Sequence, residues 1–173
     1  MNTLYSKEQN KQLYIMNQKE IILEQLNAMG FEPVELGDAG FVFKYEDLNY
    51  LYMPDEDDEQ FLRIAIPHLF EVTDENRVAV LEAMHDTSLL LKYAKVNIMY
   101  ESAAWAVYEH RLTTTDNLSE LLEHIIRVLE AAAHVFYKKI NGEEVAGRSD
   151  EPSDDDLEAE LQKMLDSIEE ESN

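Results

Sequence analysis

The spacing of the apolar residues changes along this chain from about 3.6 residues to two and back, and this change constrains the fold most. Residues 8–29 follow the helical spacing, with Gly30 positioned to end the helix and an apolar stripe of Ile15, Ile22, Leu26 and Met29. From residue 41, "FVFKYEDLNYLYM" alternates on either side of two acidic residues, which is typical of a β-hairpin. The chain therefore combines helices with strands joined by tight turns.

Two of the strands predicted beside this hairpin contain a proline, which restricts where each can lie in the sheet. "FEPVELGDAG" offers a short strand, and Pro33 argues for a place at the sheet edge because proline cannot donate a ladder hydrogen bond. "FLRIAIPHLF" places Leu62, Ile64 and Ile66 on one face, with Pro67 at a bend or bulge near its end. "AKVNIMYE" and "AWAVYEHRL" alternate cleanly and predict a second hairpin.

The apolar spacing predicts two more helices. The first covers residues 73–93, and Thr73 is expected to cap its free N–H groups. The second covers residues 116–139, keeps the i, i+3, i+4, i+7 rule almost without interruption, and must cover a sheet face. The buried stripe expected for the first of these helices is Val78, Leu81, Met84 and Ser88.

The order of elements predicts an α+β domain over residues 1–140. Helix, four strands, helix, two strands and helix give an antiparallel sheet of about five to six strands with helices packed on it. Residues 141–153 have the composition of a linker, and residues 154–173 form an acidic amphipathic tail. We expect the tail helix either to cover a binding groove as a displaceable segment or only to solubilise the chain. The apolar stripe of the tail is Leu157, Leu161, Met164, Leu165 and Ile168.

The charge of the chain excludes several classes of partner. Among 173 residues, 37 Asp and Glu stand against 14 Lys and Arg, a formal charge of −23. Phosphate backbones and anionic lipid surfaces would repel such a molecule, so we expect no nucleic acid and no membrane partner. The absence of cysteine excludes disulfides and thiolate metal sites. The polar N-terminal residues lack the apolar run of a signal peptide, so we expect a cytoplasmic protein.

The acidic run of residues 55–59 does not fit a calcium loop. Gln60 stands where the loop needs glycine, and Ile66 stands where it needs a bidentate glutamate. We interpret the run as a solvated hairpin loop, with weak binding of a cation or a basic partner as the alternative. No nucleophile and base spacing, phosphate loop or zinc-protease motif occurs, so we expect no catalytic residue, metal or cofactor, and no enzymatic activity.

Aromatic residues crowd the predicted strands and suggest a contact surface. Side chains alternate between the two faces of a sheet, and here both faces carry apolar residues. Helices could cover one face and leave the other for a second subunit or a client segment, or they could cover both faces. The partner-binding candidates are Phe41, Phe43, Tyr50, Tyr52 and Trp105.

The block "PHLFEVTDENRVAVLEAMHDTSLLLKYAKVNI" and the following "AWAVYEHRL" resemble the YbjN-like family of proposed bacterial sensory-transduction regulators. The resemblance rests on Glu75, Asn76 and Arg77 at the start of a helix, on the apolar residues after them and on the strand pair that follows, within about residues 12–140. It implies the fold of the type III secretion chaperones. It also implies a small, acidic, often dimeric helper or regulator without established catalytic residues.

These observations favour a non-enzymatic protein-binding module, chaperone-like or regulatory, that acts as a homodimer. Such a module would hold a client segment through its sheet or a groove. The alternative is a small-ligand sensor or an enzyme with a pocket between the sheet and the helices. A pocket lined by convergent polar groups would favour that alternative, and a long apolar surface would favour the first hypothesis.

Overall fold

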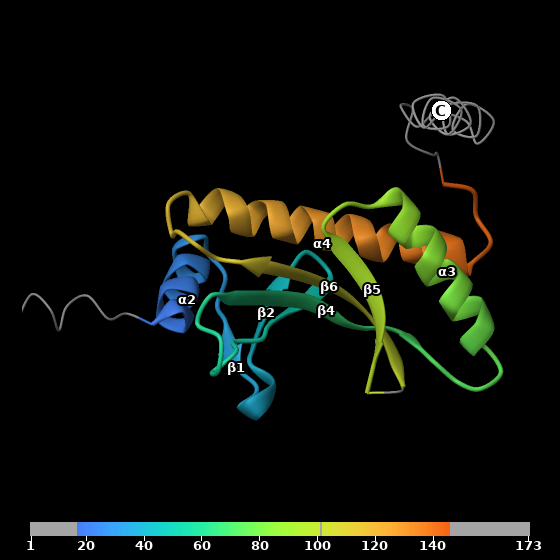
Figure 1. The fold of residues 1–173 in the computed structure, drawn as a ribbon, viewed down its shortest axis with the longest axis horizontal. Helices are drawn as coiled ribbons and strands as arrows, with labels where there is room; N and C mark the ends of the chain where they lie inside the picture. The colour runs from blue at the N-terminus through green and yellow to red at the C-terminus, as the bar shows by residue number, and fades with distance from the viewer. Residues whose placement is uncertain (1–16, 101, 146–173) are drawn as a thin grey trace, which may run out of the picture. The chain divides into compact units, whose positions relative to one another are not determined.

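Six antiparallel strands form one sheet in the part of the chain that the computed structural model describes, residues 17–100 and 102–145. The strands lie in the order β1-β2-β3-β4-β6-β5, and helices pack against them (Figure 1). The α+β fold predicted from the sequence is confirmed, together with its order of elements. The predicted tail, residues 154–173, lies outside the described residues. The elements are α2 (Gln18–Ala28), β1 (Val34–Glu35), the 3-10 turn η1 (Gly37–Ala39), β2 (Phe41–Tyr45), β3 (Leu48–Tyr52), β4 (Phe61–Glu71), α3 (Arg77–Leu90), β5 (Ala94–Met99), β6 (Ala103–Arg111) and α4 (Leu118–Ile140).

Both predicted hairpins are present in the sheet. In the first, Tyr45 of β2 pairs with Leu48 of β3, and Glu46 in the turn has a φ of 49°. In the second, Met99 of β5 pairs with Ala103 of β6. The two-residue strand β1 follows Pro33 and lies at one edge of the sheet, as the proline predicted.

A bulge interrupts β4, which lies between β3 and β6. The pairing of β4 with β6 shifts between Ile66 and Phe70, and this interval contains Pro67. A proline in an inner strand has no N–H for the ladder, so the irregularity accommodates it. The predicted bulge at Pro67 is confirmed, and the strand continues beyond it to Glu71.

The main core lies between the sheet and the helices. α4 runs along the sheet, with α2 near its beginning and α3 beside its end (Figure 1). Its predicted stripe is confirmed, because Leu122, Ile125 and Leu129 have no exposed surface. The hydroxyl of Tyr50 in β3 donates to the backbone oxygen of Ile126 at 3.4 Å and ties the sheet to α4. No helix within the described ranges is long and apolar enough to cross a membrane.

Helix α3 differs from the prediction in its start and in its buried side. It begins at Arg77, and Thr73 does not cap it: the Thr73 N–H donates instead to the side chain of Asn76 at 2.8 Å. The buried side chains are Val80, Ala83 and Thr87, whereas the predicted stripe beginning at Val78 is largely exposed. Both sides of this helix carry apolar residues, so periodicity alone could not decide which one packs.

Gly40 provides a test of the geometry where β2 begins. Its φ is +121°, and a Cβ there would lie 2.1 Å from the backbone oxygen of Tyr52. We expect Gly40→Ala to lower the free energy of unfolding by roughly 3 kcal/mol, because the backbone must shift and the conformation disfavours a side chain. Urea denaturation monitored by circular dichroism measures this loss.

Gly37 is the matched control for this substitution. Its φ of +51° is also left-handed, but a Cβ there would meet no atom within 4 Å. Gly37→Ala should therefore cost only about 1 kcal/mol. Equal losses for the two variants would contradict the close approach at Gly40.

Candidate functional site

Four of the five predicted partner-binding residues belong to the main core. Phe41, Phe43, Tyr50 and Tyr52 are at most 8% exposed and pack beneath the helices. Their rings stack in cross-strand pairs, with centroids 5.3 Å apart for Phe43 and Tyr50. A protein partner could contact Phe43 and Tyr50 only if a helix moved away, whereas Phe41 and Tyr52 also line a cavity beside α2. This placement corrects the expectation that they line a surface.

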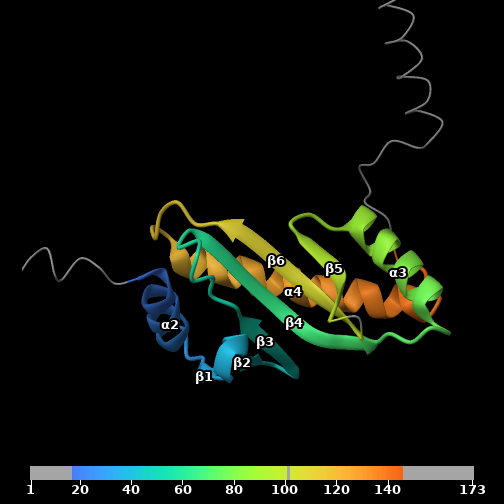
Figure 2. The same cartoon turned by 60° about the horizontal axis from the view of Figure 1, so that its bottom comes forward.

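Trp105, the fifth residue, lies on the opposite face of the sheet. Directly paired residues of antiparallel strands share a face. Trp105 and Val107 lie on the same face of β6, and Val107 pairs with Ala65 of β4. Ala65 in turn pairs with Leu51 of β3, so all four side chains lie on this face. These residues and Ala103 form a second apolar cluster. No described helix contributes to it, and in Figure 2 the strands lie in front of α4 with no helix before them. We call this side of the sheet the helix-free face.

The surroundings of Trp105 are unusual in two respects. Its indole N–H is buried and has no acceptor among the described residues. The ring centroids of His68 and Tyr100 lie 5.4 Å and 5.5 Å from that of Trp105. Both residues have a φ of 53°, a backbone conformation that residues other than glycine rarely adopt. Unpaired donors and strained backbone conformations gather at functional sites more often than elsewhere. Sequence reasoning missed His68 and Tyr100, because the fold brings them to Trp105.

An ion-pair triad occupies the other end of the helix-free face. Glu109 of β6 accepts from Arg63 of β4 at 2.9 Å and from Lys95 of β5. Partial burial acts to raise the pKa of Glu109, but the hydrogen bonds and charges of Lys95 and Arg63 outweigh it, so the pKa lies below its ordinary value of 4.5. The three residues are far apart in sequence, and only strand pairing reveals the triad.

The outer side of α3 is a second exposed apolar surface. Val78, Leu81 and Leu89 project from it, and Val78 is 68% exposed. Tyr93 follows the helix and is 68% exposed as well. Since the inner side of α3 already packs on the core, these residues are free to contact another protein.

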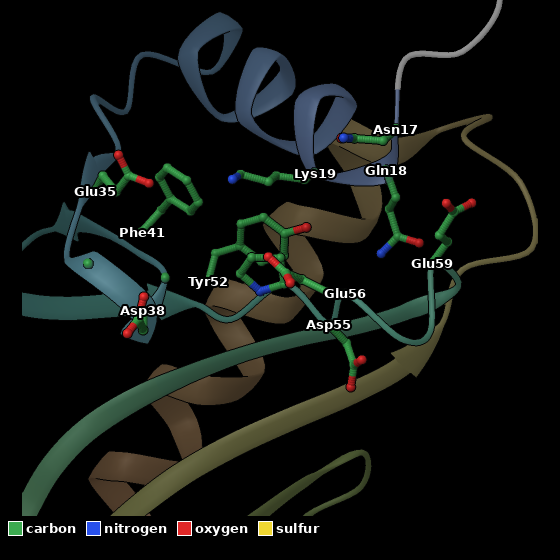
Figure 3. Close-up of a pocket in the computed structure, with 13 residues that line it drawn as sticks. Asn17, Gln18, Lys19, Glu35, Asp38, Phe41, Tyr52, Asp55, Glu56 and Glu59 are labelled. Carbon is green, nitrogen blue, oxygen red and sulfur yellow. The ribbon is translucent and has the colours of Figure 1, made fainter.

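A polar cavity of about 640 Å³ lies between the start of α2 and the edge of the sheet at β1 and β2 (Figure 3). Lys19 extends over the Phe41 ring, with its Nζ 4.9 Å from the ring centroid. Burial raises the pKa of the Tyr52 hydroxyl on the cavity wall to about 12, partly offset by a hydrogen bond with Gln18. The acids that line the cavity are Glu35, Asp38, Asp55, Glu56 and Glu59.

This cavity could hold a cationic group, because carboxylates surround an aromatic ring. Its lining among the described residues contains no histidine, serine, threonine or cysteine, so it offers no serine–histidine or cysteine–histidine pair. The predicted hairpin loop of residues 55–59 is confirmed, since it joins β3 to β4. Within that loop the Asp55 side chain accepts from the N–H groups of Asp57 and Asp58 at 2.9 Å and 3.1 Å. No group of three or more histidine and acidic side chains in the described part is placed to hold a metal ion.

The triad makes the stability of the fold depend on pH. Because the folded-state pKa of Glu109 lies below its ordinary value, the carboxylate stabilises the fold above pH 4.5, and this contribution is lost as the pH falls through the lower folded-state pKa. We expect Glu109→Gln to lower the free energy of unfolding at pH 7 by about 1–2 kcal/mol. Urea denaturation between pH 7 and pH 3 should show the difference shrinking at the acidic end.

Glu123 provides the control for this prediction. Its pair with Arg127 on α4 is exposed, with 3.7 Å between the charged atoms. Glu123→Gln should therefore cost no more than about 0.5 kcal/mol. A loss in Glu109→Gln that does not change with pH would show that the ionised carboxylate is not its cause.

Comparison with known proteins finds a likeness among solved structures. No protein-family model matches the sequence, and no curated protein matches it. Among solved structures, the chain is similar to the crystal structure of YbjN from E. coli, described there as a proposed transcription regulator. The sequence identity is 11%, the TM-score is 0.49, and the alignment covers 72% of this chain and 92% of that chain. At this level the likeness concerns the arrangement of helices and strands and not the chemistry of a site.

Proposed function

We propose that this chain is a non-enzymatic protein-binding module that holds a segment of a client protein on the helix-free face of its sheet. The observation that carries the proposal is the apolar rim of the second cluster, on the side of the sheet that no described helix covers. The cluster members themselves are at most 5% exposed, and the partly buried Val42, Met53 and Met99 leave apolar surface open around them. An exposed apolar rim with charged side chains beside it is a common feature of protein contact surfaces.

The edge of the cluster suits a variable client. Val42, Met53 and Met99 are partly buried and pack around the fully buried members of the cluster. Methionine side chains are flexible and polarisable, so they can adjust to different apolar side chains. Tyr100 is 72% exposed beside Trp105 and adds an aromatic contact at the same place.

We assign the homodimer contact to the outer side of α3. Val78, Leu81 and Leu89 follow one another at intervals of three and eight residues and lie on one side of the helix. Two copies related by a two-fold axis would place the same side of each helix against the other. This contact would leave the helix-free face available for a client.

The cavity beside α2 supports the alternative function, a small-ligand sensor. Its acids and the Phe41 ring suit a small cationic ligand. We place this alternative second because the cation of Lys19 already lies over that ring.

Substitution on the helix-free face tests the proposed function. Met99→Glu puts a charge at the edge of the apolar cluster and should abolish capture of the client in an affinity pull-down analysed by mass spectrometry. Leu36→Glu is the control, because Leu36 is exposed and lies outside the cluster. A client that is captured equally by wild type and Met99→Glu would overturn the proposal.

Light scattering tests the homodimer. At micromolar concentration the full chain should have twice its monomer mass of 20.1 kDa. Leu81→Glu with Leu89→Glu should reduce the mass to that of one chain and leave the circular dichroism spectrum unchanged, because both side chains are exposed. A monomeric wild-type chain would refute the dimer.

A further inference from the structure

The helix-free face is positively charged, although the chain carries a net charge of −23. Strand pairing places four basic and two acidic side chains of the strands on this face, which gives a net charge of +2. Four of the ten lysines and arginines between residues 17 and 145 thus lie on a single face. The basic residues are Lys44, Arg63, Lys95 and Arg111, and the acidic residues are Glu71 and Glu109.

Most of this positive charge lies at one end of the face. Glu109 is a single carboxylate between two cations, Arg63 and Lys95. The guanidinium of Arg111 donates two hydrogen bonds, of 3.0 Å and 2.9 Å, to the neutral side-chain oxygen of Gln60. Two positive charges at this end therefore have no carboxylate of the face to balance them, and a carboxylate from another protein could pair with them.

The other end of the face is apolar and aromatic. Here Trp105 packs with Tyr100 and His68, and Met99 lies at the edge of the cluster. The indole N–H of Trp105 is buried without an acceptor, which costs free energy unless a carbonyl or carboxylate oxygen reaches it. An incoming segment could pack its apolar side chains on Met99 and on the exposed ring of Tyr100 beside Trp105.

We propose that the client segment has acidic side chains at one end, which pair with the cations around Glu109, and apolar side chains at the other, which pack at Trp105. This inference rests on the proposed function and specifies the chemistry of the partner. The acids of the loop between β3 and β4 lie next to the basic end, where Phe61 begins β4. They disfavour acids beyond this end, so the acidic part of the segment is limited to the side chains that pair directly with Arg63, Lys95 and Arg111.

Other occupants fit the face less well. A second copy of the chain would place two positive faces against each other. A nucleic acid would be repelled as a long polyanion by the net charge of the whole chain, and it has no aliphatic side chains for the apolar cluster. The chain's own tail, with its acidic sequence between residues 154 and 170, is a third occupant that the experiment must distinguish.

Trp105 provides the readout, because it is the only tryptophan of the chain. The probe is a synthetic peptide with glutamates in its first half, leucines in its second half and a dansyl group at its leucine end. The matched control peptide has lysine in place of every glutamate. Energy transfer from Trp105 of the full chain should show that the glutamate peptide binds at least about tenfold more tightly than the lysine peptide.

Substitutions of exposed cations test the charge pairing. The double variant Lys95→Gln with Arg111→Gln removes two cations of the basic end and should weaken binding of the glutamate peptide about tenfold. Lys92→Gln with Arg127→Gln removes the same charge from exposed positions outside the strands and should leave the affinity unchanged. Equal affinities for the two peptides, or equal effects of the two double variants, would overturn the proposal.

Two further measurements test whether another molecule or segment occupies the helix-free face. Binding of a single-stranded oligonucleotide in place of the glutamate peptide would assign the face to nucleic acid and overturn the proposal. The chain has no cysteine, so a nitroxide on Ser167→Cys labels the tail alone. Quenching of Trp105 by this label that does not depend on protein concentration would assign the face to the chain's own tail, and this too would overturn the proposal.

The two proposals can fail separately. In one case the Met99→Glu variant loses its client in the pull-down but the glutamate peptide does not bind the wild-type chain. The inference that the client segment is acidic is then wrong, and the proposed function stands. If Met99→Glu keeps its client, the proposed function is wrong.

Discussion

The packing of α4 on one face of the sheet is the interaction on which the rest of this structure depends. Its apolar stripe is continuous over six turns, and the side chains of Leu122, Ile125 and Leu129 are fully buried. A stripe of this length can be removed from water only by an equally long apolar surface, which the alternate residues of the strands provide. The hydrogen bond from Tyr50 to the backbone of Ile126 adds a directional link to this contact.

This packing also decides which residues remain for contacts with other proteins. Once α4, α2 and α3 occupy one side, the aromatic residues on that side become core, and Trp105 remains on the other side with a small cluster of its own. The charged residues of the strands follow the same division. Arg63, Lys95 and Glu109 come together on the helix-free face because their strands are neighbours and each residue has the same orientation. A strongly acidic chain thereby gains a face with a small positive charge.

Two irregular positions of the fold, His68 and Tyr100, lie close to the same face. The bulge at Pro67 brings the His68 ring to Trp105, and the turn after β5 brings Tyr100 to it from the other side. The backbone of His68 and Tyr100 is held in a conformation that costs free energy, and packing against the indole helps to offset that cost. His68 and Tyr100 therefore affect both the stability of the fold and the shape of the helix-free face around Trp105.

The sequence by itself determined the elements and their order. Alternation defined both hairpins, Pro33 and Pro67 marked an edge and a bulge, and the uninterrupted stripe of residues 116–139 identified the helix that covers the sheet. These are local signals, since each depends on residues close together in the chain. The tertiary structure alone decided which apolar side faces inward, because α3 and the sheet each have two apolar sides. It also decided the surroundings of Trp105 and Glu109, because residues distant in sequence meet there only after the strands have paired.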